Sequence, residues 1–164
     1  HGIATLLNNI GILCERLDQM PEAMRAYQES LQISVEIGDR RGQDHCYANM
    51  VFVAVNLGQS ADAARYAGHA LALTDDLDIE YILPHVIAGF AAVELANNQA
   101  KSSAEMLGTV LNVEALDDDF CSLRFDPLME QLQATLSKPD LDAAIIRGKE
   151  RAVDDLIWSL RDAN

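Results

Sequence analysis

Several residue types are scarce in this chain of 164 residues, and each scarcity excludes a class of protein. The three cysteines form no CxxC pair and leave an odd count, which argues against a disulfide framework and a cysteine metal site. Four prolines, nine glycines and 5% aromatic residues are few, so helix is favoured over strand. No apolar run approaches the ~20 residues that span a bilayer. We therefore expect an all-α protein that does not enter a membrane.

Basic residues are also scarce, because 12 Lys and Arg stand against 26 Asp and Glu, giving a formal net charge of −14. Phosphate neutralisation needs clustered basic side chains, so the balance argues against direct nucleic-acid binding and against an anionic membrane surface. We predict a cytoplasmic protein. The first helix is under way by Ile3, so we also expect the chain to be a fragment of a longer protein.

The chain is organised by a repeat of forty residues. The segment from Leu17 to Ala23 reads leucine, turn residue, glutamine, two connectors, acid, alanine, and the segment from Leu57 to Ala63 repeats this order. A third copy follows, in which Asn98 takes the place of Gly58. A period in this range indicates a solenoid of helical hairpins, and three hairpins suffice for a shared core.

The repeat predicts three hairpins, at about 3–38, 42–77 and 83–113, which together form an array over residues 1–113. The third should begin near Leu83 with Pro84 in its first turn. In the first helix an apolar stripe at helical spacing is expected to face inward. It consists of Ile3, Leu6, Leu7, Ile10, Leu13, Cys14 and Leu17.

Residues 114–164 break the period and should form a connecting loop and a helical cap. We predict a helix from Asp126 to about Leu136, a second from Asp140 to Arg147 stopped by Gly148, and a third from about Glu150 to Arg161. Trp158 should lie on the apolar side of the last helix. An array needs such a terminal unit to cover its last apolar face.

The first hairpin resembles the tetratricopeptide repeat. That family places a small residue midway along the first helix and alanines with an aromatic residue along the second, as do Asn9-Ile10-Gly11, Ala23, Tyr27 and Ser30 here. Each unit is about six residues longer than the ~34-residue standard. The resemblance implies a right-handed superhelix of hairpins that binds proteins or peptides.

A second resemblance concerns the end of the chain. The run from Gly89 to Ala96, the segment from Ala104 to Gly108, and a helix pair interrupted at Gly148-Lys149 are similar to the C-terminal regions of large bacterial signal-transduction ATPases. That group includes LuxR-type and antibiotic-regulator-type transcription activators. The resemblance implies a ligand-sensing array within a transcriptional regulator.

With the stripe facing inward, the opposite faces of the first helices should line a concave groove. Polar residues alternate there with apolar ones, a mixture suited to peptide capture, although coverage of these residues by the cap or by a neighbouring helix is an equally good interpretation. The predicted binding residues are Asn9, Ile12, Arg16, His45, Asn49, Phe52 and Asn56.

We find no spacing that indicates a catalytic group, a metal site or a cofactor. The leading hypothesis is a non-catalytic, protein-binding or peptide-binding, ligand-sensing module of a larger cytosolic regulator. Its partner is a protein, a peptide or another domain of the parent chain. The alternatives are a structural scaffold that forms a homodimer and an enzyme with an unrecognised pocket.

Overall fold

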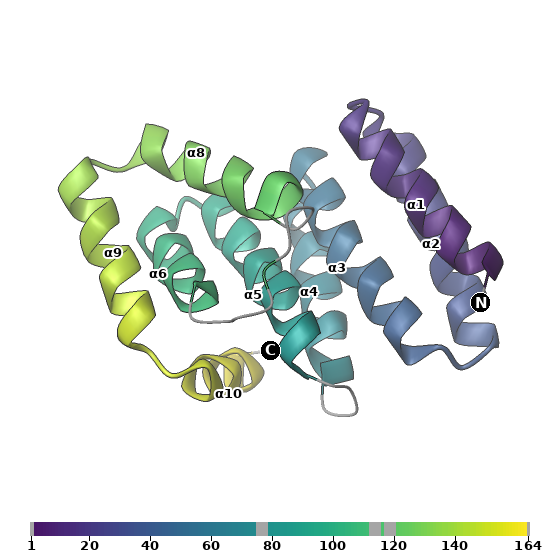
Figure 1. Cartoon of the computed structure of the whole chain (residues 1–164). Coiled ribbons are helices and arrows are strands. Elements are labelled where there is room, and N and C mark those ends of the chain that lie inside the picture. Colours follow the sequence, from purple (N-terminus) through teal and green to yellow (C-terminus); the bar gives the residue numbers. More distant parts are fainter. Residues whose placement is uncertain (1, 75–78, 112–115, 117–120, 164) are drawn as a thin grey trace. The chain divides into compact units, whose positions relative to one another are not determined.

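The protein is entirely helical in the part of the chain that the structure describes (Figure 1). This structure, a computed structural model, describes residues 2–74, 79–111, 116 and 121–163, and the side chains of all of these except 79–82 and 163. The chain divides into two compact units, His1–Asp78 and Ile79–Asn164. The predicted all-α fold of tetratricopeptide-like hairpins is confirmed, whereas the predicted boundary at residue 113 stays a prediction.

The first unit contains two helical hairpins. Helices α1 (Gly2–Arg16) and α2 (Met20–Glu36) form the first, and α3 (Arg40–Asn56) and α4 (Ser60–Leu73) form the second. Helix α2 packs against both α1 and α3. The predicted end of the second hairpin, at residue 77, lies outside the described residues.

Gly11 allows α1 and α2 to approach closely, as its place in the repeat pattern predicts. A Cβ atom at Gly11 would overlap the ring of Tyr27, which is fully buried between the two helices. The Tyr27 hydroxyl donates a hydrogen bond to the carboxylate of Glu15, which is itself buried. A small residue on one helix and an aromatic ring on the other therefore form a single packing unit.

The elbows of the hairpins are the same motif repeated at forty-residue intervals. Asp18, Gly58 and Asn98 all adopt left-handed backbone conformations, with φ of 57°, 72° and 62°. At each elbow the N–H of the following glutamine donates to a carbonyl five residues earlier, and the three N···O distances are all 2.8 Å. This is the Schellman arrangement, in which a left-handed residue ends a helix and satisfies its last carbonyls.

We predict that Gly58→Ala lowers the free energy of unfolding by about 1 kcal/mol, because a Cβ is strained at this φ although nothing crowds it. Asp18→Gly at the equivalent elbow should raise it by up to about 1 kcal/mol. Urea unfolding of the two variants and the parent measures both. Equal signs for the two changes would contradict the strain argument.

The inward stripe predicted for the first helix is wrong for most of its members. Ala4, Gly11 and Glu15 are the buried residues of α1, whereas five members of the stripe are exposed. These are Ile3, Leu6, Ile10, Leu13 and Leu17, with exposed fractions of 68%, 61%, 40%, 59% and 67%. The periodicity correctly identified a helix with an apolar face, but that face points away from α2.

The second unit begins with α5 (Ile79–Ala96) and α6 (Ala100–Val110), followed by a π-helical turn, η2 (Cys121–Phe125). Pro84 lies inside α5, so the prediction that it occupies the first turn is wrong: the helix starts five residues earlier. The predicted end of this hairpin, at residue 113, is outside the described residues.

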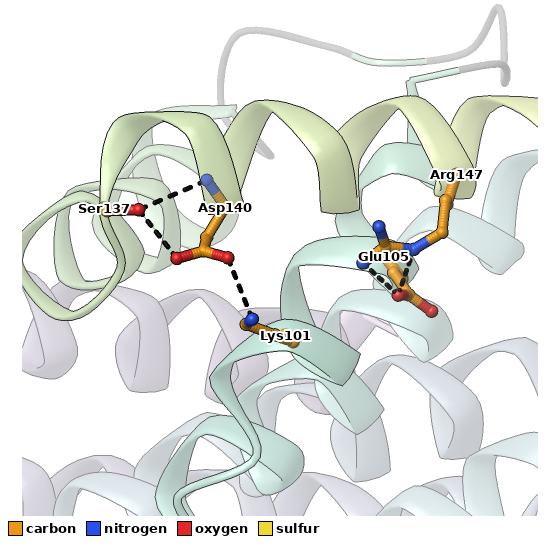
Figure 2. Close-up of polar contacts among 5 residues, drawn as sticks. All are labelled: Lys101, Glu105, Ser137, Asp140 and Arg147. Atoms are coloured by element: carbon orange, nitrogen blue, oxygen red, sulfur yellow. Dashed lines mark hydrogen bonds and ion pairs between the residues drawn. The ribbon is translucent and has the colours of Figure 1, made fainter.

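The C-terminal segment forms three helices, α8 (Asp126–Thr135), α9 (Lys138–Glu150) and α10 (Val153–Ala163). Helix α9 packs along α6. Two ion pairs join these helices, Lys101 with Asp140 at 2.9 Å and Arg147 with Glu105 at 2.7 Å (Figure 2). The earlier residue of α6 pairs with the earlier residue of α9, and the later with the later. Helix α9 therefore runs parallel to α6. In contrast, α3 turns back along α2 after a three-residue elbow.

Gly148 is not a helix stop, contrary to the prediction, but a crossing point inside α9. A Cβ there would collide with the backbone oxygen of Glu105 and lie 2.8 Å from the Cα of Gly108. The hydroxyl of Thr109 donates to the Gly148 carbonyl at 3.0 Å. Two glycines therefore set the spacing between α6 and α9.

We predict that Gly148→Ala destabilises the protein by about 1 to 3 kcal/mol through this collision with backbone. Helix propensity alone would make the same change stabilising by about 1 kcal/mol. The sign of the change in unfolding free energy therefore shows which effect dominates. Thermal unfolding measures it, with Gly2→Ala, where nothing lies within 4 Å of the added Cβ, as the control.

The last helix buries Leu156 and Leu160, at 1% and 7% exposed. Trp158 is 70% exposed, so its predicted place on the apolar side of this helix is wrong. Residues 156 and 160 are one helical turn apart, whereas residue 158 is about 200° away from residue 156 around the axis. The helical spacing of the two leucines, and not the size of the tryptophan, therefore defines the buried face of α10.

Candidate functional site

A pocket of about 80 Å³ lies in the first unit where α1, α2 and α3 meet. Its walls carry hydroxyl, amide, imidazole and carboxylate groups from all three helices. The lining residues are Ala4, Thr5, Asn8, Ser30, Ser34, Asp39, Gly42 and His45.

Two serines on α2, one turn apart, line the pocket and differ in their hydrogen bonding. The Ser30 hydroxyl donates to the Ala4 carbonyl at 2.8 Å and accepts from the Cys46 thiol at 3.2 Å, so it joins the three helices. The Ser34 hydroxyl is fully buried and has no hydrogen-bond partner. A buried hydroxyl without a partner costs roughly 1 to 3 kcal/mol, so Ser34 is available to a ligand group that enters the pocket.

The rim of the pocket is formed by the start of α3. Asp39 caps this helix, with its Oδ1 accepting from the Gly42 N–H at 3.0 Å. Burial lowers the pKa of His45, with Arg41 acting in the same direction and Asp39 opposing both. His45 is therefore neutral at pH 7, and its imidazole presents one donor and one acceptor.

The predicted groove residues differ in their exposure: some are exposed, some are half-buried and two are buried. Asn9, Arg16 and Asn56 are exposed, and Ile12 and His45 are half-buried. Of the seven, only His45 lines the pocket. Thr5 and Asn8, which do line it, precede Asn9 and Ile12 by one turn of α1.

Asn49 and Phe52 are buried, at 7% and 6% exposed, so they do not face solvent as the groove prediction requires. The Asn49 amide donates to the Asn8 side-chain oxygen at 3.2 Å. This bond joins the first helices of two adjacent hairpins and positions Asn8 at the pocket. Asn49 therefore links α3 to Asn8, which lines the pocket. The role of the predicted residues in binding stays a prediction.

The serines of the pocket were absent from the predicted site. Their sequence signal is a pair of hydroxyl residues at positions i and i+4 on an otherwise apolar face. The repeat carries Ala70 and Thr74 at the equivalent positions. Comparing the two hairpins in sequence shows that Ser30 stands where the second hairpin has Ala70. Only the structure shows that the Ser34 hydroxyl lacks a hydrogen-bond partner.

Asp44, on α3, is 1% exposed and its Oδ1 has no hydrogen-bond partner. Burial raises the pKa of this carboxyl from 3.8 to about 7. Because the folded-state pKa lies above the unfolded one, the stability that this group contributes is fully present below pH 3.8 and is lost as pH rises to about 7.

We predict that Asp44→Asn raises the free energy of unfolding at pH 8 by an amount on the order of 4 kcal/mol relative to the parent, and changes it little at pH 4. Denaturant unfolding of both proteins across this pH range tests it. A constant difference between them at all pH values would show that Asp44 does not titrate in the folded state.

In the described part of the chain, the cysteine thiols, the groups that could bind a metal ion and the helices that could cross a membrane bear on what the protein can do. The cysteines are free, and burial raises the pKa of the Cys46 thiol to about 11, so it stays protonated at neutral pH. Among the described residues no group of three His, Cys, Asp or Glu side chains is placed to hold a metal ion. No described helix is both long and apolar enough to cross a membrane.

Comparison with known proteins agrees with the hairpin geometry. A protein built of stacked helical hairpins with left-handed elbows belongs to the class of α-helical repeat proteins. The family model of the tetratricopeptide repeat matches residues 2–76, which include α1 to α4. The match supports a tetratricopeptide repeat array in this part of the chain. No curated protein and no solved structure matches the chain.

Proposed function

We propose that this chain is a non-catalytic module that binds an extended peptide of a partner protein beside α1 and α3. The observation that carries the proposal is the pocket between these helices, with the buried and unpartnered Ser34 hydroxyl at its floor. Tetratricopeptide repeats generally mediate interactions between proteins, which supports a binding role for residues 2–76.

The pocket suits the end of a basic or amide side chain. Asp39 supplies a carboxylate, and Thr5 and Ser34 supply hydroxyl oxygens that accept hydrogen bonds. The net charge of −14 favours a partner that carries Lys or Arg and should speed its association at low salt. Asn9, Ile12 and Arg16 continue along α1 from the pocket and would contact the rest of the peptide.

We further propose that the module belongs to a larger cytosolic regulator, which controls transcription. The residues that carry this resemblance include Gly108 and Gly148, and these two glycines meet at the crossing of α6 and α9. This crossing supports the cap that the resemblance implies. A homodimeric scaffold is the second candidate, and light scattering over a concentration series distinguishes it.

The peptide proposal predicts that Ser34→Ala weakens binding at least tenfold, about 1.4 kcal/mol, while leaving stability unchanged or higher. The ligand is a lysine-containing peptide selected from an array probed with the full chain, and fluorescence polarisation measures its affinity. Removing a hydroxyl that has no partner costs the fold nothing, so the two readouts should move in opposite directions.

Ser103→Ala is the matched control. Ser103 is also fully buried, its hydroxyl also lacks a partner, and it does not line the pocket. Its substitution should change stability as Ser34→Ala does and leave affinity unaltered. If both variants bind the peptide as the parent does, the pocket is not the site. If no peptide in the array binds, the proposed function fails.

A further inference from the structure

The outer face of α1 is an apolar surface that is exposed in the first unit. We define the α1 stripe as Ile3, Leu6, Ile10, Leu13 and Leu17, all of them between 40% and 68% exposed. They follow a spacing of three and four residues, so they share one face of the helix. Leucine and isoleucine concentrated on one exposed face indicate an interaction surface rather than scattered apolar residues.

The next hairpin reveals what covers this face when it is occupied. A shift of forty residues places Leu6, Ile10 and Leu13 on Cys46, Met50 and Val53 of α3. These three are 1%, 2% and 0% exposed. The counterparts of Leu6, Ile10 and Leu13 are therefore buried on α3, whereas Leu57, the counterpart of Leu17, is 37% exposed.

The helix that covers the α3 stripe is α2, the second helix of the preceding hairpin. Ser30 contacts the Cys46 thiol at 3.2 Å, and the Gln43 amide donates to the Ser34 carbonyl at 3.3 Å. The small serines, one turn apart on α2, allow the two helices to approach closely. A Cβ at Gly42 would lie 2.7 Å from the Ser34 hydroxyl, which shows how little space remains.

From this equivalence we propose that the α1 stripe is the docking surface for the second helix of a further hairpin, ahead of α1 in the same array. The docked helix presents small residues at positions i and i+4 between aliphatic ones, as α2 does with Ser30 and Ser34, and it runs antiparallel to α1.

The charge on α1 agrees with such an occupant. Its only acid, Glu15, is buried and bonded to Tyr27, and its only basic residue, Arg16, is in the last turn. A chain of net charge −14 thus keeps this one face free of exposed carboxylates. Burial of the stripe contributes stability without desolvating charge, at roughly 25 cal/mol per Å² of apolar surface.

The test inserts a copy of residues 2–41 directly before Gly2 of the full chain, which keeps the forty-residue period. Leu6→Gln and Leu13→Gln in the copy make its own outer face polar and give its α1 peptides a different mass. We expect amide hydrogen exchange of the native α1 to slow at least tenfold, and the melting temperature to rise.

The control carries the same insertion with Leu6→Gln and Leu13→Gln also in the native α1, and it should lose both effects. Native α1 amides that exchange as fast with the insertion as without it would overturn the proposal. A copy that remains unfolded by circular dichroism counts against it equally, because the copied sequence folds as a hairpin in its native position.

A second copy of the chain is the competing occupant. If the parent is a dimer by light scattering, and Leu6→Gln with Leu13→Gln makes it a monomer of unchanged helicity, the stripe pairs with itself and the proposal is wrong. A parent that remains monomeric supports the hairpin. Neither outcome depends on peptide binding in the pocket, so this inference and the proposed function succeed or fail separately.

Discussion

The left-handed elbow residue is the constraint on which the hairpins depend. With one residue at positive φ, the chain leaves a helix and reverses within three residues, and the following N–H closes a bond to a carbonyl five residues back. Asp18, Gly58 and Asn98 do this with three different side chains. The common backbone geometry, rather than a conserved residue type, fixes the antiparallel pairing of helices.

Close helix packing follows from small residues placed at the crossings. Gly11 accommodates the Tyr27 ring, Gly42 lies against Ser34, and Gly108 crosses Gly148. In each case an added methyl group would meet atoms already in contact, so helices held this closely leave little room for repacking. The pocket lies beside the contact of Gly42 with Ser34, and the Ser34 hydroxyl that lines it has no hydrogen-bond partner.

Helix α6 in the second unit is covered by a later helix of the same unit. After α6, the chain returns through α8 and places α9 parallel along it, held by the glycine crossing and two exposed ion pairs (Figure 2). Exposed pairs contribute at most about 1 kcal/mol each, so they add little to the close packing that the two glycines allow. The α1 stripe in the first unit is exposed instead, and it is the surface from which the further inference starts.

The sequence by itself determined the helices and their elbows, because a period of forty residues and a spacing of three to four are properties of the chain alone. It identified the apolar face of α1 without deciding whether anything covers it, since periodicity defines a face and not its neighbour. Gly148 resembled a helix stop, and only the position of Glu105 and Gly108 makes it a crossing. Likewise Asn49 and Phe52 are buried, and Ser34 lacks a partner, through contacts between segments that no local pattern encodes.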